Sequence, residues 1–188
     1  MNRQLKSSAI RQTRTRMLEV TFKNVLLPGV AACVLIIGGV VVAQDRDPFA
    51  GTWRLNVEKS TMDMSSPSAS KSETVTYRYE NGEEIYSSDA ITSRGEKEHT
   101  DYRGVYDGPY GHITMTIEGK VVTDAPLQLR KLDPRTRLRI AMQPDGTLRG
   151  IIVRRLSEDG QTITSSILGF DRTGKVTNSQ TRVFEKVK

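Results

Sequence analysis

The chain has 188 residues, a formal net charge of +6 and a single cysteine, Cys33. Residues 1–24 contain six basic residues and Glu19, which leaves 22 basic and 21 acidic residues in the remainder. The high overall charge is therefore a property of the N-terminus, and it does not indicate a nucleic-acid partner. A lone cysteine also excludes an internal disulfide, so the apolar core must stabilise the fold.

A basic leader, residues 1–24, precedes an almost uninterrupted apolar segment, residues 25–43, and the chain turns polar at Gln44. This order is typical of an export signal or of a membrane anchor, and we expect one apolar helix here. The part that follows is then expected in the cell envelope. It is either periplasmic or secreted, or held by a single membrane span with the C-terminal domain outside.

Cleavage and anchoring remain open alternatives for this segment. Residues 41–43, Val-Val-Ala, place small residues at the third and first positions before a cut, as signal peptidase sites do. Residues 25–42 are also just long enough to span a bilayer, and the long basic leader favours retention. A start at Met17 would shorten that leader. The sequence thus predicts either a mature chain beginning near Gln44 or a single-pass anchor.

A linker, residues 44–50, leads into residues 51–188, which are enough for one domain with its own core. Apolar and polar residues alternate there in short runs divided by glycine-containing turns, and this alternation predicts strands with one wet face. One turn of helix is expected only at residues 57–62. The predicted strands are residues 51–57, 72–80, 83–92, 97–106, 112–118, 126–132, 136–143, 147–156, 161–169 and 176–186.

The last three turns are evenly spaced, since Gly146, Gly160 and Gly174 lie 14 residues apart. One strand plus its turn has about this length, so the spacing predicts an antiparallel meander. Sheets of this size avoid open edges by closing, and we expect an all-β, up-and-down barrel, with a two-sheet β-sandwich as the alternative. The longest predicted loop, residues 61–71, follows the first strand, where it is placed to act as a lid.

The opening of the domain carries a family resemblance. Gly51-Thr52-Trp53-Arg54-Leu55-Asn56, with Lys59-Ser60 after it, resembles the first strand of small exported bacterial lipocalin-like proteins. The resemblance continues at residues 74–77, 106–108 and 183–186 and so covers nearly all of the predicted domain. Most of that family is uncharacterised, and the resemblance implies a lipocalin-like barrel without assigning a ligand.

In the wider calycin group, the tryptophan of the opening strand closes the barrel floor, and an arginine from a late strand lies across its ring. Attraction between a cation and a ring favours that arrangement. The resemblance therefore assigns the floor to Trp53, with Arg182 as the first candidate for the arginine and Arg154 as the second. Related haem-binding barrels place a histidine ligand in a late strand, and this chain has no histidine after His112.

No set of acid, base and nucleophile is visible, so we predict neither an enzyme nor a cofactor. His99 lies among Glu96, Glu98 and Asp101, but alternate residues of one strand point to opposite faces. We interpret these charges as a solvated face and predict no metal site, because structural zinc sites show denser ligand sets.

Our main functional hypothesis is a non-catalytic module that binds a small, partly apolar molecule inside the barrel. It rests on the fold by analogy. The residues expected to line the interior are Tyr77, Tyr79, Leu138, Ile140, Met142, Ile163 and Ile167.

A second hypothesis is a structural envelope protein with a filled barrel and a basic outer face. Residues 130–155 contain eight basic and two acidic residues, whereas residues 73–107 contain four basic and nine acidic ones. Such a face would contact anionic lipid or an envelope polymer. The residues expected to project outward and form it are Arg137, Arg139, Arg149 and Arg155.

Overall fold

The computed structural model describes residues 47–188. The predicted leader and apolar segment, residues 1–24 and 25–43, lie outside the described residues, and so does the choice between cleavage and anchoring. Within the described part, no helix has the length and apolar character needed to cross a membrane.

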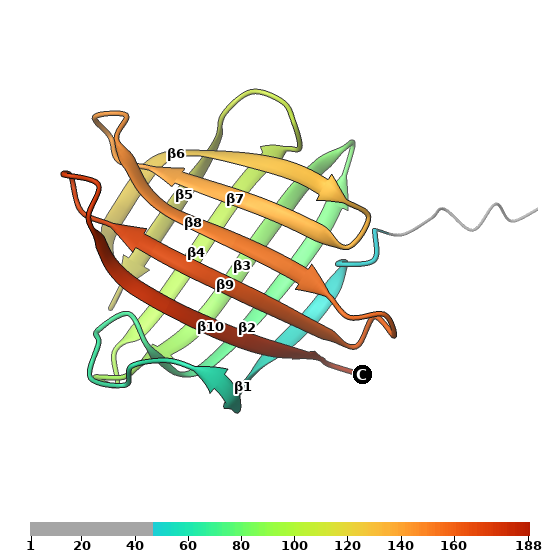
Figure 1. Ribbon diagram of the computed structural model, residues 1–188, viewed down its shortest axis with the longest axis horizontal. Helices are drawn as coiled ribbons and strands as arrows, with labels where there is room; N and C mark the ends of the chain where they lie inside the picture. The colour runs from blue at the N-terminus through green and yellow to red at the C-terminus, as the bar shows by residue number, and fades with distance from the viewer. Residues whose placement is uncertain (1–46) are drawn as a thin grey trace, which may run out of the picture. The chain divides into compact units, whose positions relative to one another are not determined.

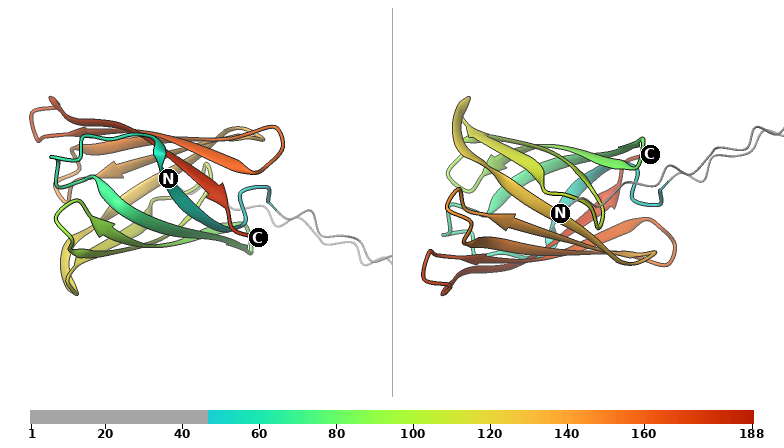
Figure 2. Two further views of the ribbon diagram at one scale, coloured as in Figure 1. Left: turned by 90° about the horizontal axis from the view of Figure 1, so that it is seen from below. Right: turned by 90° about the horizontal axis from the view of Figure 1, so that it is seen from above.

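The domain is an antiparallel β-barrel of ten strands in chain order, closed where β1 pairs with β10. Figures 1 and 2 show the strands running obliquely around one barrel. The all-β barrel prediction is confirmed, and the two-sheet sandwich is excluded. The strands are β1 (Gly51–Thr61), β2 (Ser70–Glu80), β3 (Glu83–Thr92), β4 (Lys97–Val105), β5 (Gly111–Ile117), β6 (Lys120–Asp133), β7 (Thr136–Met142), β8 (Leu148–Leu156), β9 (Thr162–Phe170) and β10 (Val176–Lys186).

The helical turn expected at residues 57–62 is wrong, because β1 continues as a strand to Thr61. Its pairing with β10 shifts register between Asn56 and Thr61. At this irregularity the Asn56 side chain accepts a hydrogen bond from the Lys59 amide (3.0 Å), and the Ser60 hydroxyl donates to the Asn56 carbonyl (2.6 Å). These local bonds form a β-bulge between Asn56 and Thr61. The bulge interrupts the pairing with β10 but does not end the strand.

The packed end of the barrel is built around Trp53, which is fully buried as predicted. Its indole nitrogen donates a hydrogen bond to the Phe49 carbonyl (2.9 Å), so the segment before β1 folds under the floor. Leu127, Leu129 and Ile163 complete this core and are at most 1% exposed. The ten-stranded sheet closes and its core is filled within the described residues, so the barrel is a self-contained folding unit.

The cation over the Trp53 ring is Lys186, whose amine lies 5.0 Å from the ring centroid. The expected partners Arg182 and Arg154 are therefore wrong for this role. The register of β1 and β10 sets Lys186 directly opposite Trp53, whereas Arg182 lies four residues earlier on the same strand. A late-strand cation does cover the tryptophan, but it is a lysine.

Strand β7 has its faces reversed relative to our expectation. Arg137 is 0% exposed, and Arg139 lines an internal cavity. Since side chains alternate along a strand, Leu138, Ile140 and Met142 lie on the outer face instead of lining the interior. Their outward-facing partners on β8 are also apolar, since Leu138 pairs with Val153 and Ile140 with Ile151. The wall of β7 and β8 is thus basic inside and apolar outside.

Candidate functional site: the barrel interior

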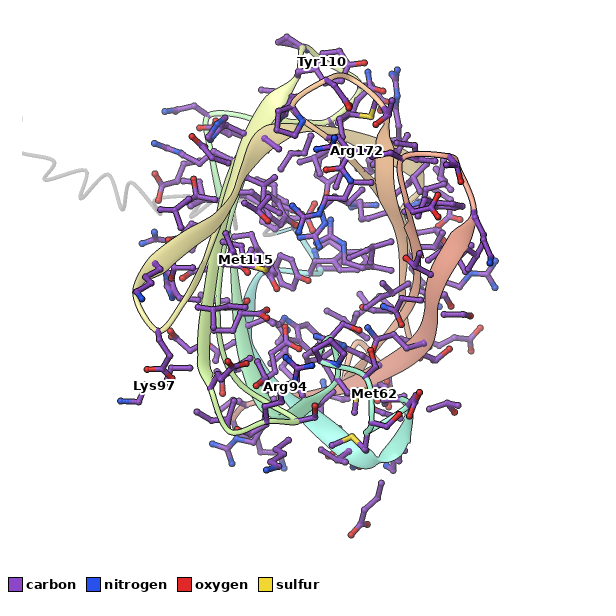
Figure 3. All side chains as sticks on the ribbon, turned by 90° about the vertical axis from the view of Figure 1, so that its left-hand side faces the viewer. Met62, Arg94, Lys97, Tyr110, Met115 and Arg172 are labelled. Atoms are coloured by element: carbon purple, nitrogen blue, oxygen red, sulfur yellow. The ribbon has the colours of Figure 1, made fainter. Side chains whose placement is uncertain are left out.

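An internal cavity of about 370 Å³ occupies the end of the barrel opposite the Trp53 floor. Figure 3 looks into this end, where Met62, Arg94 and Arg172 lie on the connecting loops and Met115 points inward. Pro67 and Ser68, from the loop between β1 and β2, lie among the lining residues. The longest connection of the barrel is therefore at the cavity, in the position expected for a lid.

The cavity combines an apolar wall with charged and hydroxyl groups. The apolar lining comes mainly from Ile113, Met115 and Ile117 of β5, with Ala141, Ile152 and Ile167 from β7, β8 and β9. The polar lining comes from Glu73, Ser88, Glu98, Thr100, Thr123, Arg139, Arg149, Asn178, Gln180 and Arg182. Although more polar than apolar side chains line the cavity, its exposed surface is mainly apolar, and small-molecule sites likewise combine an apolar surface with polar groups.

Three tyrosines on neighbouring strands form a ladder between the cavity and the floor. The rings of Tyr86 and Tyr102 are stacked, with centroids 4.4 Å apart, and Tyr77 packs on Tyr86 at 5.2 Å. Arginines from the opposite wall cover this ladder: the guanidinium carbon of Arg154 lies 4.8 Å from the Tyr77 ring, and that of Arg139 lies 5.0 Å from the Tyr102 ring. The aromatic faces offset part of the cost of placing these cations inside.

Below the ladder lies a fully buried carboxylate, Glu84. It accepts hydrogen bonds from the hydroxyls of Tyr79 (2.6 Å), Tyr102 (2.5 Å) and Tyr106, and from the Arg154 guanidinium (2.8 Å). Burial by itself would raise the pKa of Glu84, but the charge of Arg154 and the donated hydrogen bonds outweigh it and lower the pKa. Glu84 is thus an ionised partner that balances Arg154.

A second buried arginine, Arg137, is balanced by the segment before β1. Its guanidinium donates hydrogen bonds to the Asp47 carboxylate (3.1 Å) and to the Asp133 carbonyl (2.6 Å), and its carbon lies 4.8 Å from the Phe49 ring. Arg137 and Arg154 stand directly opposite each other on β7 and β8. Their repulsion makes the separate acidic partners, Asp47 and Glu84, necessary.

Arg182 connects the cavity wall to the loop. Its guanidinium donates to the Glu73 carboxylate (2.5 Å) and to the Ser68 carbonyl (2.6 Å). Both side chains of the ion pair are largely buried. The predicted floor residue therefore holds residues 62–69 against the barrel instead of covering Trp53.

The seven residues expected to line the interior divide by strand. Tyr77 and Ile167 line internal space, Ile163 is fully buried in the floor, and Tyr79 reaches Glu84. The three residues of β7 lie outside. Sequence reasoning missed Glu84, Tyr86 and Tyr102, although Glu84-Tyr86-Ser88 and Glu98-Thr100-Tyr102 alternate with the period of a strand and mark a polar inner face.

The four arginines expected to form a basic outer face do not share one face. Arg137 is buried, Arg139 and Arg149 line the cavity, and only Arg155 is exposed. Arg149 and Gly150 are adjacent on β8, and regular alternation would place them on opposite faces. Both line the cavity, because the register of β7 and β8 shifts between Ala141 and Met142. The outward projection of these residues was therefore a wrong prediction for three of the four.

Both histidines lie on the outer surface, and for His99 this agrees with the solvated face that we expected. His99 contacts the carboxylates of Asp89 (2.7 Å) and Asp101 (2.6 Å). These contacts raise the pKa of His99, and the hydrogen bond with Asp89 contributes most. His112 contacts Asp124 at 2.7 Å. Across residues 47–188 no group of three or more histidines, cysteines or carboxylates is arranged to hold a metal ion.

No protein-family model matches the chain, and no curated protein matches it either. The lipocalin-like resemblance of the opening strand therefore stays a prediction. The closed barrel and its cavity are established by the geometry of the structure, without support from a related protein.

Proposed function

We propose that the barrel is a non-catalytic binding module that takes one small, partly apolar molecule into its interior. The observation that carries this proposal is the cavity of about 370 Å³ at the end away from Trp53. This volume is near the lower end of the range of about 300–1,000 Å³ for ligand sites, which favours a compact ligand. A structural barrel has no need for such a space, since interiors otherwise pack closely.

The absence of catalysis is part of the proposal. The buried carboxylate of Glu84 is engaged by hydrogen bonds from three tyrosines and Arg154, and Glu84 is not among the residues that line the cavity. The carboxylates that do line it are Glu73, which is paired with Arg182, and Glu98. Neither stands next to a nucleophile and base arranged for group transfer.

Uptake of a neutral fluorescent probe, N-phenyl-1-naphthylamine, by residues 44–188 tests the proposal. Met115→Trp fills the cavity from the β5 wall and should abolish probe uptake. Met142→Trp, the same change on the outer face of β7, is the matched control and should leave uptake unchanged. Equal uptake by both variants and the wild type, with the barrel still folded by circular dichroism, would place the probe elsewhere and reject an interior site.

Export is the second part of the proposal, and it rests on residues 1–43 of the sequence. We propose a module of the cell envelope, released by cleavage before Gln44 or held by residues 25–43. The intact mass of protein recovered from the envelope decides between the two, and Ala43→Trp should leave the precursor uncut if a signal peptidase acts there.

A further inference from the structure

Two arginines inside the cavity have no carboxylate partner among the described residues. The guanidinium of Arg139 packs on Tyr102, and its Nε is buried without a hydrogen-bond partner. Arg149, at the start of β8, donates a hydrogen bond to the Thr123 hydroxyl. Neither arginine takes part in any ion pair found within residues 47–188. Partly buried cations without a counter-ion are costly, and they are expected where an anion binds.

The charges lining the cavity do not cancel. Arg182 and Glu73 satisfy each other at 2.5 Å, which leaves Arg139 and Arg149 facing a single acid, Glu98. Burial, followed by the charge of Glu73, raises the pKa of Glu98, and the charges of Arg182, Arg149 and Arg139 act in the opposite direction. Burial and then the charge of Arg139, which lines the same cavity, lower the pKa of Arg149. One added negative charge would balance the cavity.

Resting on the proposed function, we propose that the ligand is a singly charged amphipathic oxyanion, a carboxylate or a sulfonate, whose head group binds between Arg139 and Arg149. Arginine favours this chemistry because its planar group donates two parallel hydrogen bonds to a pair of oxygens. The apolar body of the ligand packs on Ile113, Met115 and Ile117 of β5. Doubly charged phosphate monoesters fit less well, because only one positive charge is in excess.

Calorimetric titration of the full chain in lipid nanodiscs tests the head group, with empty nanodiscs as the blank. The three probes share one apolar body: octanoate, octane-1-sulfonate and 1-octanol. At least one anion should bind about tenfold or more tightly than the alcohol, as a charge-assisted bidentate contact implies. The tighter anion identifies the head group. Equal binding of all three probes would overturn this inference and leave the proposed function standing. Binding of none of them would also overturn this inference. The neutral-probe test of the cavity would then decide the proposed function separately.

Four variants locate the binding site. Arg139→Gln and Arg149→Gln should each weaken binding of the preferred anion by about tenfold and leave 1-octanol unchanged. Glu98→Gln removes the competing carboxylate and should strengthen anion binding, an opposite sign that general loss of structure does not produce. Arg155→Gln, on the outer face of the same strand as Arg149, should change nothing. An anion affinity unaffected by Arg139→Gln and Arg149→Gln, or lowered equally by Arg155→Gln, would refute the site.

Discussion

At the scale of single residues, the barrel depends on pairing its two most deeply buried arginines, Arg137 and Arg154, with separate carboxylates. Arg154 is 3% exposed and is balanced by Glu84, while Arg137 is balanced by Asp47. Two nitrogen atoms of Arg154 remain without hydrogen-bond partners within residues 47–188, and the Tyr77 ring faces the group instead. Since a buried ion pair costs desolvation on both sides, its strength shows mainly when one partner is removed.

Glu84→Gln should therefore destabilise the barrel by about 3–5 kcal/mol, because Arg154 is left as a buried charge without a counter-ion. Urea unfolding followed by circular dichroism measures the change. The control is Glu83→Gln, which breaks a surface pair with Arg103 (3.1 Å). That change should cost less than about 1 kcal/mol. Similar losses in the two variants would mean that Glu84 does not carry the charge balance.

The same carboxylate predicts a pH dependence of stability. The folded barrel lowers the pKa of Glu84, so its contribution is fully present above the unfolded value and is lost as the pH falls through the folded one. The unfolded value is about 4.3. The free energy of unfolding of the wild type should decline below about pH 4.3. Other lowered carboxylates, such as Glu185, add to this decline. The difference between wild type and Glu84→Gln isolates Glu84, and a difference that stays constant down to pH 2 would contradict the assignment.

At the scale of elements, the positions of the strands were predictable and the inward face of one of them was not. The ranges expected for β3 and β10, residues 83–92 and 176–186, match the structure, because alternation and glycine turns are local signals. In β7, alternation shows that two faces exist but not which of them is inside. The rule that apolar residues point inward predicted the wrong face. Arg137 and Arg139 face inward because Asp47 and the aromatic ladder, far away in the sequence, offer them partners. Such contacts are non-local, so no pattern within residues 136–142 reports them.

Arg182 contacts the loop of residues 62–69 through the Ser68 carbonyl. Arg182→Gln removes the charged donor from the Ser68 carbonyl and from Glu73. Amide exchange at Ala69 and Ser93, whose backbone bonds hold this loop, should then become faster by roughly tenfold. The Leu156 amide, in the floor, reports whether the whole barrel has loosened instead. Arg172→Gln, in the turn between β9 and β10, is the control. If this variant accelerated amide exchange at Ala69 and Ser93 equally, the loop would not be held by Arg182.

At the scale of the whole molecule, Asp47 and Phe49, which precede β1, are part of the barrel floor. Phe49 is fully buried, its carbonyl accepts the bond from Trp53, and Asp47 is the counter-ion of the buried Arg137. The floor therefore requires the chain from Asp47 onward, although the sheet itself begins at Gly51. Cleavage before Gln44, as proposed, would leave every one of these contacts in place. Within the predicted linker of residues 44–50, Asp47 and Phe49 therefore belong to the barrel floor.

Three start points test this arrangement. Chains beginning at Gln44 and at Asp47 should have the same free energy of unfolding within about 0.5 kcal/mol, since both retain Asp47 and Phe49. A chain beginning at Gly51 should lose at least about 3 kcal/mol, because the Phe49 side chain leaves a cavity and Arg137 loses its carboxylate. Denaturant unfolding compares the three, and Phe49→Ala in the longest chain separates the packing loss from the loss of charge balance. A Gly51 chain as stable as the other two would show that the barrel floor is complete without Asp47 and Phe49.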